Sequence, residues 1–257
     1  MIIMEISLDI RKSVEENAGS YFERAKKARK KTGGAREAVE KYKKKLGNIK
    51  EEKVEKKEVV KKRVKKEWYE KFRWFVSSDG FLVIGGRDAT TNEIVIKKYT
   101  DKDDMVFHTD MAGSPFVVVK REGKGEIPET TLNEAAVFTA VFSRAWKRGL
   151  STLPVFRVKP EQVSKKAKAG EHLAKGAFMI YGETTYHNPE MSYGVGIYQG
   201  KAMGGPLSAV KKHCKEHVEV FQGNEKLSDV AKKIKSKIGG DLDDILRALP
   251  AGSKVRK

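Results

Sequence analysis

The sequence predicts an α+β protein with a basic helical segment at its N-terminus. Residues 9–71 are predicted as helix, because apolar residues such as Val14, Ala18 and Phe22 recur at helical spacing and no proline interrupts them. From Trp74 onward, short segments rich in β-branched and aromatic residues are bounded by turn residues, which is typical of strands. At least one apolar helix lies among these strands, and this combination defines the α+β class.

The N-terminal segment is predicted to form a helical hairpin, or short coiled coil. A turn at Gly47-Asn48 gives one arm over residues 8–46 and a return arm over residues 50–72, with a kink at Gly33-Gly34. Alternatively, Gly33-Gly34 is itself the turn. Residues 11–71 contain 23 Lys and Arg against 11 Asp and Glu, an excess that a merely solvated coiled coil does not need.

Composition narrows the classes of partner and compartment. The chain has 257 residues and a net charge of +18, which predicts a polyanionic partner such as nucleic acid. An anionic membrane surface is the other usual candidate, but no other feature of the sequence supports it. No apolar run approaches the roughly 18 residues that a membrane span needs. Cys214 is the only cysteine, so no intramolecular disulfide can form, and a reducing cytoplasm is expected.

The remaining elements are predicted from pattern and turn residues. Strands are expected at residues 73–78, 81–86, 105–110, 116–121, 153–158, 177–182 and 193–199. A helix over residues 130–149 is expected to begin with a Thr131–Glu134 capping box and to end at Gly149. Helices are also expected at residues 206–217, 227–240 and 241–252. The predicted domains are 1–72, a helical hairpin; 73–205, a globular domain; and 206–257, a helical extension.

The stretch "GFLVIGGRD", residues 80–88, has the glycines of a phosphate loop but not its pattern. Gly80 and Gly85 enclose "FLVI", which favours a strand, and Gly86-Arg87 stands where a phosphate loop needs Lys-Ser/Thr. We therefore expect Asp79-Gly80 to be a hairpin turn. Arg87 then follows a strand end with little side-chain bulk around it, where its guanidinium can contact a phosphate or, alternatively, a backbone carbonyl.

Three further patterns leave alternatives open. The segment "EIVIKKY" prefers strand by composition, whereas Thr90 with Glu93 form a possible helix-start capping box. His108 and Asp110 lie on one side of a predicted strand and could form an acid–base pair, a polar RNA contact or structural hydrogen bonds. Aromatic residues in "WYEKFRWF" could stack on unpaired RNA bases beside neighbouring cations, but their helical spacing predicts that they dock the return arm onto the sheet.

Taken together, several long motifs resemble a known family. "WYEKFRWFVSSDGFLVIGGRDATTNEIVIKKY", "HTDMAGSPFVVVK", "TLNEAAVFTAVFSRAW" and "VSKKAKAGEHLAKGAFMIYG" occur in the order and spacing of NFACT-R. This is the RNA-binding domain of the NEMF and fibronectin-binding-protein-A-like ribosome quality-control factors. The resemblance implies a compact domain with a mainly antiparallel sheet, a helix after Gly86-Arg87, and no cofactor or metal.

Members of that family bind the large ribosomal subunit and recruit tRNA, and some extend the stalled nascent chain. The family's N-terminal NFACT-N domain has no counterpart in this sequence, so the resemblance implies a stand-alone form, not one that extends chains by itself. We therefore expect a cytoplasmic, non-enzymatic RNA-binding protein whose partners are tRNA, large-subunit ribosomal RNA and the ribosome. Two alternatives stay open: a module that pairs with a separate NFACT-N-like protein, and an RNA-processing enzyme using His108 and Asp110.

The candidate RNA contacts are basic or polar residues in the predicted globular domain. They are Arg73, Arg87, His108, Asp110, Ser114, Lys120, Ser164, Lys165, Lys166 and Lys168.

Overall fold

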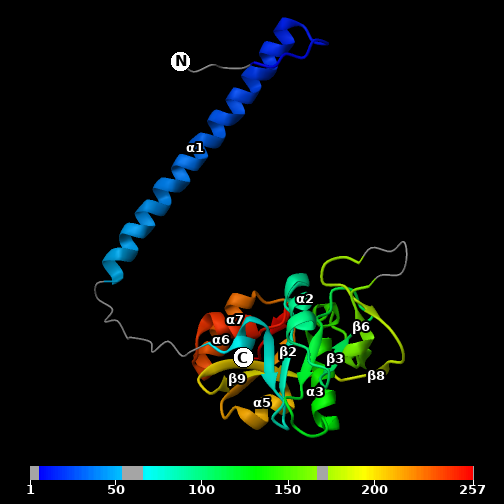
Figure 1. Ribbon diagram of the computed structural model, residues 1–257. Helices are drawn as coiled ribbons and strands as arrows, with labels where there is room; N and C mark the ends of the chain where they lie inside the picture. The colour runs from blue at the N-terminus through cyan, green and yellow to red at the C-terminus, as the bar shows by residue number, and fades with distance from the viewer. Residues whose placement is uncertain (1–5, 54–65, 167–172, 257) are drawn as a thin grey trace. The chain divides into compact units, whose positions relative to one another are not determined.

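The computed structural model describes residues 6–53, 66–166 and 173–256, and the side chains of residues 44–53 are not described. The chain divides into two compact units, Met1–Val64 and Lys65–Lys257, here called unit 1 and unit 2 (Figure 1). No helix in these described ranges combines the length and the apolar character that crossing a bilayer requires.

In its described part, unit 1 consists of residues 6–13 and one long helix, α1 (Val14–Lys53). The helix begins with a capping box: the Glu16 N–H donates to the Ser13 hydroxyl at 3.2 Å, and the Ser13 N–H donates to the Glu16 carboxylate at 2.8 Å. The buried Asn17 amide accepts from the Asp9 N–H at 2.9 Å and donates to the Asp9 carbonyl at 3.0 Å. These bonds fold the preceding residues back onto the first turns of α1.

Neither predicted hairpin turn is present, because α1 continues through both Gly33-Gly34 and Gly47-Asn48. Each glycine costs a helix about 1 kcal/mol, but the Ala, Lys, Glu and Arg residues around them favour helix. The predicted return arm begins inside α1 and then enters residues 54–65, which lie outside the described residues. Its last residues form a short 3-10 helix, η1 (Trp68–Lys71), in unit 2.

The apolar side chains of α1 are exposed. Val14, Phe22 and Tyr42 are 80%, 72% and 64% accessible, and α1 is the only helix among the described residues of unit 1. The predicted helix is present over Val14–Lys53, whereas the coiled-coil pairing stays a prediction.

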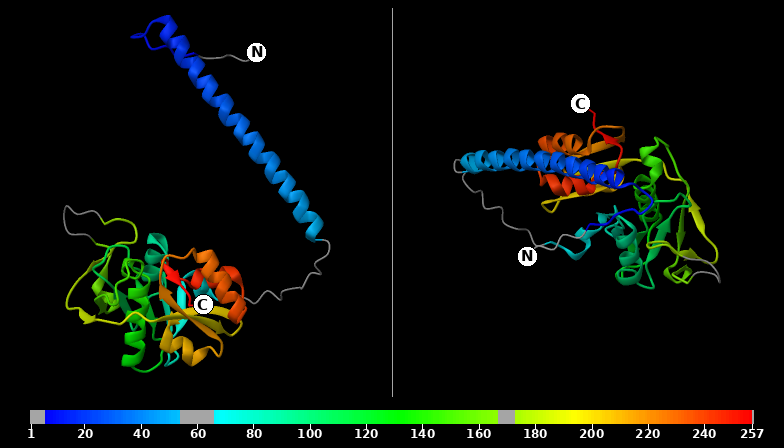
Figure 2. Two further views of the ribbon diagram at one scale, coloured as in Figure 1. Left: turned by 180° about the vertical axis from the view of Figure 1, so that it is seen from behind. Right: turned by 90° about the horizontal axis from the view of Figure 1, so that it is seen from above.

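Unit 2 contains three antiparallel sheets, seen from further directions in Figure 2. The six-stranded sheet has the order β1 (Arg73–Val76), β2 (Leu82–Gly85), β4 (Val117–Lys120), β3 (Met105–His108), β5 (Val155–Val158), β8 (Thr185–His187). The four-stranded sheet has the order β10 (Lys201–Pro206), β9 (Tyr193–Tyr198), β11 (His217–Gln222), β12 (Ser253–Lys254). The smallest pairs β6 (Val163–Ser164) with β7 (Met179–Ile180). All seven predicted strands occur, and the antiparallel arrangement is confirmed.

The Asp79-Gly80 hairpin turn is confirmed. The Ser77 N–H donates to the Phe81 carbonyl at 2.8 Å, and Gly80 has a φ of +83° that suits glycine. The turn joins β1 to β2, whose register pairs Arg73 with Gly85. Arg73, the first residue of β1, therefore lies beside Gly85, the last residue of β2, at one end of the sheet.

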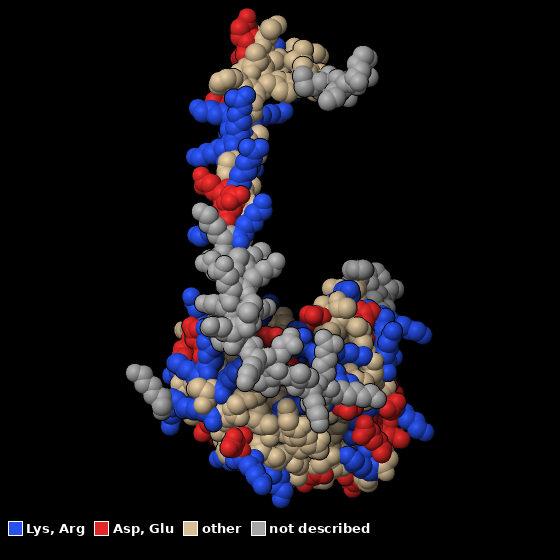
Figure 3. Space-filling view, turned by 90° about the vertical axis from the view of Figure 1, so that its left-hand side faces the viewer, with Lys and Arg blue, Asp and Glu red and all other residues tan. Residues whose placement is uncertain are grey.

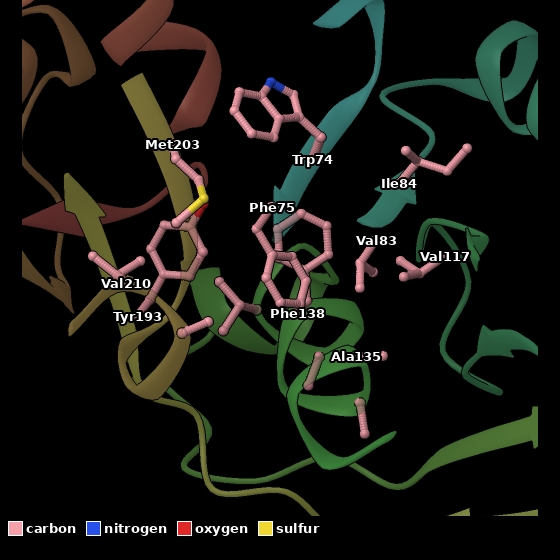
Figure 4. Close-up of a cluster of buried hydrophobic side chains, with 14 of the residues drawn as sticks. Trp74, Phe75, Val83, Ile84, Val117, Ala135, Phe138, Tyr193, Met203 and Val210 are labelled. Carbon is pink, nitrogen blue, oxygen red and sulfur yellow. The ribbon is translucent and has the colours of Figure 1, made fainter. Parts of the chain in front are cut away.

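Helices pack around the two larger sheets. They are α2 (Ala89–Lys98), α3 (Glu129–Val141), α4 (Arg144–Lys147), α5 (Leu207–His213), α6 (Leu227–Ile238) and α7 (Leu242–Ala248), with the 3-10 helix η2 (Pro160–Gln162). Figure 4 shows Phe138 of α3 beside Phe75 of β1, and their ring centroids are 4.8 Å apart. Gly205 lets β10 approach β1, because a Cβ there would lie 2.9 Å from the Phe75 Cβ. The two sheets and α3 thus share one hydrophobic core.

The predicted helix over residues 130–149 is two helices, α3 and α4. Its capping box is wrong: Thr131 is buried and donates to Asp79 at 2.8 Å, and Glu134 accepts from the Ser78 N–H at 2.8 Å. Both side chains therefore anchor α3 to the β1–β2 turn instead of capping it. Gly149, with a φ of +76°, follows α4 as expected of a residue that ends a helix.

The last fifty residues belong to the core of unit 2. β11 pairs with β9 and β12 pairs with β11, so this segment completes the four-stranded sheet. Ile234 of α6 and Ile245 of α7 are fully buried. The boundary predicted between residues 205 and 206 falls within β10, and unit 2 continues across it.

Candidate nucleic-acid interface

A pocket of about 450 Å³ opens where the end of β2, the start of α2, the β3–β4 connection and residues 175–178 meet. Arg73, Arg87, His108 and Ser114, which are four of the predicted RNA contacts, all line it. We call it the arginine pocket and define it by six of its lining residues: Arg73, Arg87, Asn92, His108, Phe142 and Phe178.

The glycine pair and the start of α2 shape this pocket. Gly86 has no room for a side chain, since a Cβ would lie 1.9 Å from the Asn92 Oδ1. Asp88 then caps α2 by accepting the Thr91 N–H at 2.8 Å, and this hydrogen bond lowers the pKa of the Asp88 carboxyl. The helix implied by the resemblance is confirmed, but Asp88 and Thr91 cap it in place of Thr90 and Glu93.

Arg87 is held mainly by backbone carbonyls. Its guanidinium donates to the carbonyls of Lys71 at 3.2 Å, Phe72 at 2.9 Å and Arg247 at 3.1 Å. Burial, and then the charge of Arg247, lower the pKa of Arg87. The side chain therefore joins the start of β1 to the end of α7, and two of its five N–H groups remain for a ligand.

Arg73 is less tightly bound and faces the same pocket. Its guanidinium donates to the Gly86 carbonyl and lies over the Phe142 ring, with its central carbon 4.5 Å from the ring centroid. Burial and the neighbouring charge of Arg87 lower the pKa of Arg73 to about 10. Within the described residues, no carboxylate forms an ion pair with either arginine. Arg73 and Arg87 are thus two neighbouring, partly buried cations that have no ion-paired carboxylate, and such a pair favours binding of a phosphate.

His108 forms an inner wall of the pocket. Its ring stacks on Phe116 with centroids 3.9 Å apart, and its Nδ1 lies 2.9 Å from the Pro115 carbonyl. Burial lowers the pKa of His108, so the ring is neutral near pH 7. Asp110 instead accepts from the Tyr186 hydroxyl at 3.2 Å, and no hydrogen bond joins it to His108 in the described part of the chain. The geometry gives no support to an acid–base pair.

The lowered pKa of His108 predicts that acid destabilises unit 2. In the unfolded chain the histidine has a pKa of about 6.5 and takes up a proton below that pH, whereas the folded protein keeps the ring neutral to a lower pH. The contribution of His108 to the free energy of unfolding is therefore complete above about pH 6.5 and is lost as the pH falls toward the pKa of the folded protein. The slope of the free energy of unfolding against pH approaches about 1.4 kcal/mol per pH unit for one such group. Urea unfolding between about pH 7.5 and 5.5 measures it.

Replacing His108 with Phe provides the control for this pH dependence, because it keeps an aromatic ring on Phe116 and removes the titrating group. The slope should decrease without vanishing, since the pKa of His187 is also lowered by burial. An unchanged slope in the variant would contradict the assignment to His108.

The two serines predicted to contact RNA, Ser114 and Ser164, form hydrogen bonds within the protein instead. The Ser114 hydroxyl donates to the Met111 carbonyl at 2.8 Å and also bonds the Thr109 hydroxyl, which orders the β3–β4 connection. The Ser164 hydroxyl accepts from the Lys166 N–H at 3.1 Å. Each side chain shapes a loop near the pocket, and Ser114 also borders it.

Lys165 builds a wall of the pocket. Its ammonium donates to the carbonyls of Ala174 at 2.9 Å and Ala177 at 3.0 Å, and it lies 3.7 Å from Glu93 of α2. Gly176 donates to the same Glu93 at 3.2 Å, and a Cβ on it would lie 2.5 Å from the Ala89 carbonyl oxygen. These contacts fix residues 174–178 against α2. Lys166 is exposed beside them, and Lys168 lies outside the described residues.

Lys120 cannot contact RNA as predicted, because it is buried. Its side chain is only 5% exposed and its ammonium bonds Asp101 at 2.7 Å, the Tyr99 carbonyl at 3.0 Å and the buried Asp104. Lys120 was proposed as a basic residue at the end of the strand segment "FVVVK". The Asp-rich turn before β3 instead supplies carboxylates directly beside the end of β4.

Sequence reasoning missed the residues that complete the pocket. Asn92 comes from α2, Phe142 from the end of α3, and Phe178 from the segment before β7. All three lie within the family motifs, but no local pattern marks any of them as a binding residue. They meet only because the β3–β4 connection and residues 174–178 fold against α2.

Basic side chains also cover surfaces away from the pocket. Figure 3 shows Lys and Arg side chains along α1 and on the described surface of unit 2. On α6, Lys232, Lys233, Lys235 and Lys237 are all exposed. A polyanion could therefore contact more of the molecule than the arginine pocket.

Residues 71–182, which contain the whole arginine pocket, match the family described as NFACT protein RNA binding domain. The chain therefore carries an RNA-binding domain of the NFACT-R class. It is also a homologue of named quality-control proteins: over 75% of its length it is 48% identical to the archaeal Rqc2 homolog aRqcH of Methanocaldococcus jannaschii. Over 67% of its length it is 38% identical to ribosome quality control complex subunit NEMF of Homo sapiens.

The chain spans 30% of that archaeal relative and 16% of human NEMF. A solved structure, the C-terminal of the fibronectin/fibrinogen-binding protein from Streptococcus suis, is 18% identical with a TM-score of 0.40. That likeness covers 69% of this chain and 76% of the other.

Proposed function

We propose that this chain is a non-catalytic RNA-binding protein that acts on tRNA or large-subunit ribosomal RNA, in ribosome quality control in the cytoplasm. The observation that carries the proposal is the pair of guanidinium groups, Arg73 and Arg87, at one pocket of an NFACT-R domain. Neither forms an ion pair within the described residues, so a phosphate of RNA can supply the missing anion.

The exposed lysines support the same proposal in a different way. The segment from Arg11 to Lys71 carries 23 basic against 11 acidic residues, and α6 adds four exposed lysines. Such charges bind phosphates without reading sequence, because counterions leave the RNA when the protein replaces them. We propose that they strengthen binding and that the arginine pocket fixes where the RNA lies.

Equilibrium binding of the whole chain to labelled tRNA and to large-subunit ribosomal RNA fragments tests this proposal. We expect binding at about 50 mM salt that weakens linearly, on logarithmic axes, toward about 200 mM salt. A preference for one RNA over the other would identify the target. Negligible affinity for both at the lower salt concentration would refute RNA binding.

A second function is favoured by the exposed apolar residues of α1. Phe22 and Tyr42 are 72% and 64% accessible, more than a purely solvated helix needs. We propose that α1 also docks on a separate NFACT-N-like protein. Mixing the two purified proteins should give a complex that Phe22→Glu weakens. Independent migration of the wild-type proteins at micromolar concentrations would rule this partner out.

A further inference from the structure

The arginine pocket is larger than a phosphate requires. Its volume of about 450 Å³ lies in the range of about 300–1,000 Å³ that is typical of small-ligand pockets. The two guanidinium groups occupy one part of its lining. Aromatic rings, neutral polar groups and small residues build most of the rest, together with Asp88, which caps α2, and Lys175. The extra space therefore calls for a ligand with an uncharged, flat part beside its phosphate.

Aromatic rings supply a surface for such a flat group. Phe178 meets Phe116 edge to face with centroids 5.2 Å apart, and Phe116 in turn stacks on His108. Phe142 lies in the part of the pocket that holds the arginines, with its ring under the guanidinium of Arg73. Proteins bind unpaired bases on surfaces of this kind, because each base has an aromatic face that stacks on the ring.

Neutral polar groups supply a donor and an acceptor. The Asn92 Oδ1 accepts from the Phe116 N–H at 3.1 Å, which leaves the amide nitrogen of Asn92 as the side chain's donor. This nitrogen has no hydrogen-bond partner among the described residues. The Pro115 carbonyl can only accept, so the His108 Nδ1 carries the proton and its Nε2 is an acceptor. A nucleobase edge, which presents donors and acceptors side by side, can pair with both.

From this arrangement we infer that the arginine pocket takes a single unstacked nucleotide of the bound RNA. Its phosphate lies against Arg73 and Arg87, and its base lies against Phe178 with its edge at Asn92 and His108. The inference rests on the proposed RNA binding and adds what that proposal lacks, a site for one base.

The pocket wall is already fixed before a ligand arrives. Gly176 has a φ of +77° and contacts the start of α2, and Glu93 accepts from its N–H at 3.2 Å. Lys165 bonds the carbonyls on either side of this glycine. A preformed wall reduces the entropy that ordering the site would cost, which favours binding of a ligand as small as one nucleotide.

Competition experiments test this inference with the whole chain. Four nucleoside 5′-monophosphates and inorganic phosphate would each displace a labelled single-stranded RNA at constant ionic strength. At least one monophosphate should compete at least about fivefold more strongly than inorganic phosphate, because stacking of the base adds to the phosphate contact. Equal competition by phosphate and by every monophosphate would overturn the inference, although RNA binding itself would stand.

Matched variants locate the base. Phe178→Leu keeps an apolar side chain but removes the ring, so the ratio of nucleotide to phosphate competition should fall toward one. Asn92→Asp keeps the acceptor for the Phe116 N–H and replaces the free donor with a negative charge, so competition by both ligands should weaken. Arg121→Ala removes one partly exposed charge beyond the opposite end of β4, where it bonds the carbonyls of Lys124 and Gly125, and should change neither. An unchanged ratio in a folded Phe178→Leu protein would place the base elsewhere and overturn the inference.

If the wild-type chain binds no RNA at all, the proposed function fails and the nucleotide pocket fails with it. If RNA binds but its displacement is insensitive to Phe178→Leu, only the nucleotide pocket fails. The thermal unfolding midpoint of each variant, measured alongside, separates a lost contact from a lost fold.

Discussion

Lys120→Met should destabilise unit 2 by about 3–5 kcal/mol, the usual cost of removing one partner of a buried ion pair. The substitution leaves the Asp104 carboxylate, which is only 1% exposed, without its cation. Asp101 is 80% exposed and can turn to water, so most of the loss comes from Asp104. Urea unfolding monitored by tryptophan fluorescence measures the change, since Trp74 and Trp146 are buried.

A second variant identifies the cause of this loss. In Lys120→Met combined with Asp104→Asn, no charge is left buried, so the double variant should be more stable than Lys120→Met alone. RNA affinity should stay within about twofold in any of these variants that remain folded. If Lys120→Met kept full stability but bound RNA about tenfold more weakly, Lys120 would be an RNA contact and the burial argument would be wrong.

Lys120 also shows where local pattern misleads. A charged residue at the end of "FVVVK" normally marks the point where a strand reaches solvent. Pairing of Met105 with Val119 instead brings the Asp-rich turn, residues 101–104, beside Lys120. The strand and its neighbour were both predicted, but their register depends on contacts between segments that a single-sequence pattern does not encode.

The strands and most helices were predictable because each has its own period and its own turn residues. β11 was missed, although Val218 and Val220 alternate with His217 and Glu219 as a half-buried strand requires. The helix predicted over residues 206–217 ended at His217, and no element was predicted for the residues that follow it. In α2 the composition was misleading. The β-branched residues of "EIVIKKY" favour a strand, but the segment is a helix that Asp88 caps at its N-terminus.

The candidate site was predictable only in part. Arg87 was found because two glycines beside it leave room for a phosphate, and Arg73 was found as a basic residue among the aromatic residues of "WYEKFRWF". Asn92, Phe142 and Phe178 belong to three separate segments, and no local pattern marks them as binding residues. Their meeting depends on Gly86 and Gly176, which allow backbone and side chains to approach more closely than any other residue permits.

Arg73→Gln should weaken RNA binding about tenfold or more, because a hydrogen bond to a charged group contributes about 1.5–3 kcal/mol. Arg73 is a better test than Arg87, whose three bonds to backbone carbonyls would make any substitution a test of stability as well. The slope of log affinity against log salt should also decrease, by about 0.7–0.9 for one lost phosphate contact. Fluorescence anisotropy titrations at several salt concentrations measure both quantities.

Arg73→Lys separates charge from geometry at this position. It keeps the positive charge, so the salt dependence should remain close to that of the unmodified chain. It loses the planar fork that bonds a phosphate in two places and the stacking on Phe142, so affinity should still fall. Arg121→Ala is the control, because it removes one partly exposed charge beyond the far end of β4. If Arg121→Ala and Arg73→Gln weakened binding equally, RNA would be held by the general charge of the surface, and the arginine pocket would not be its site.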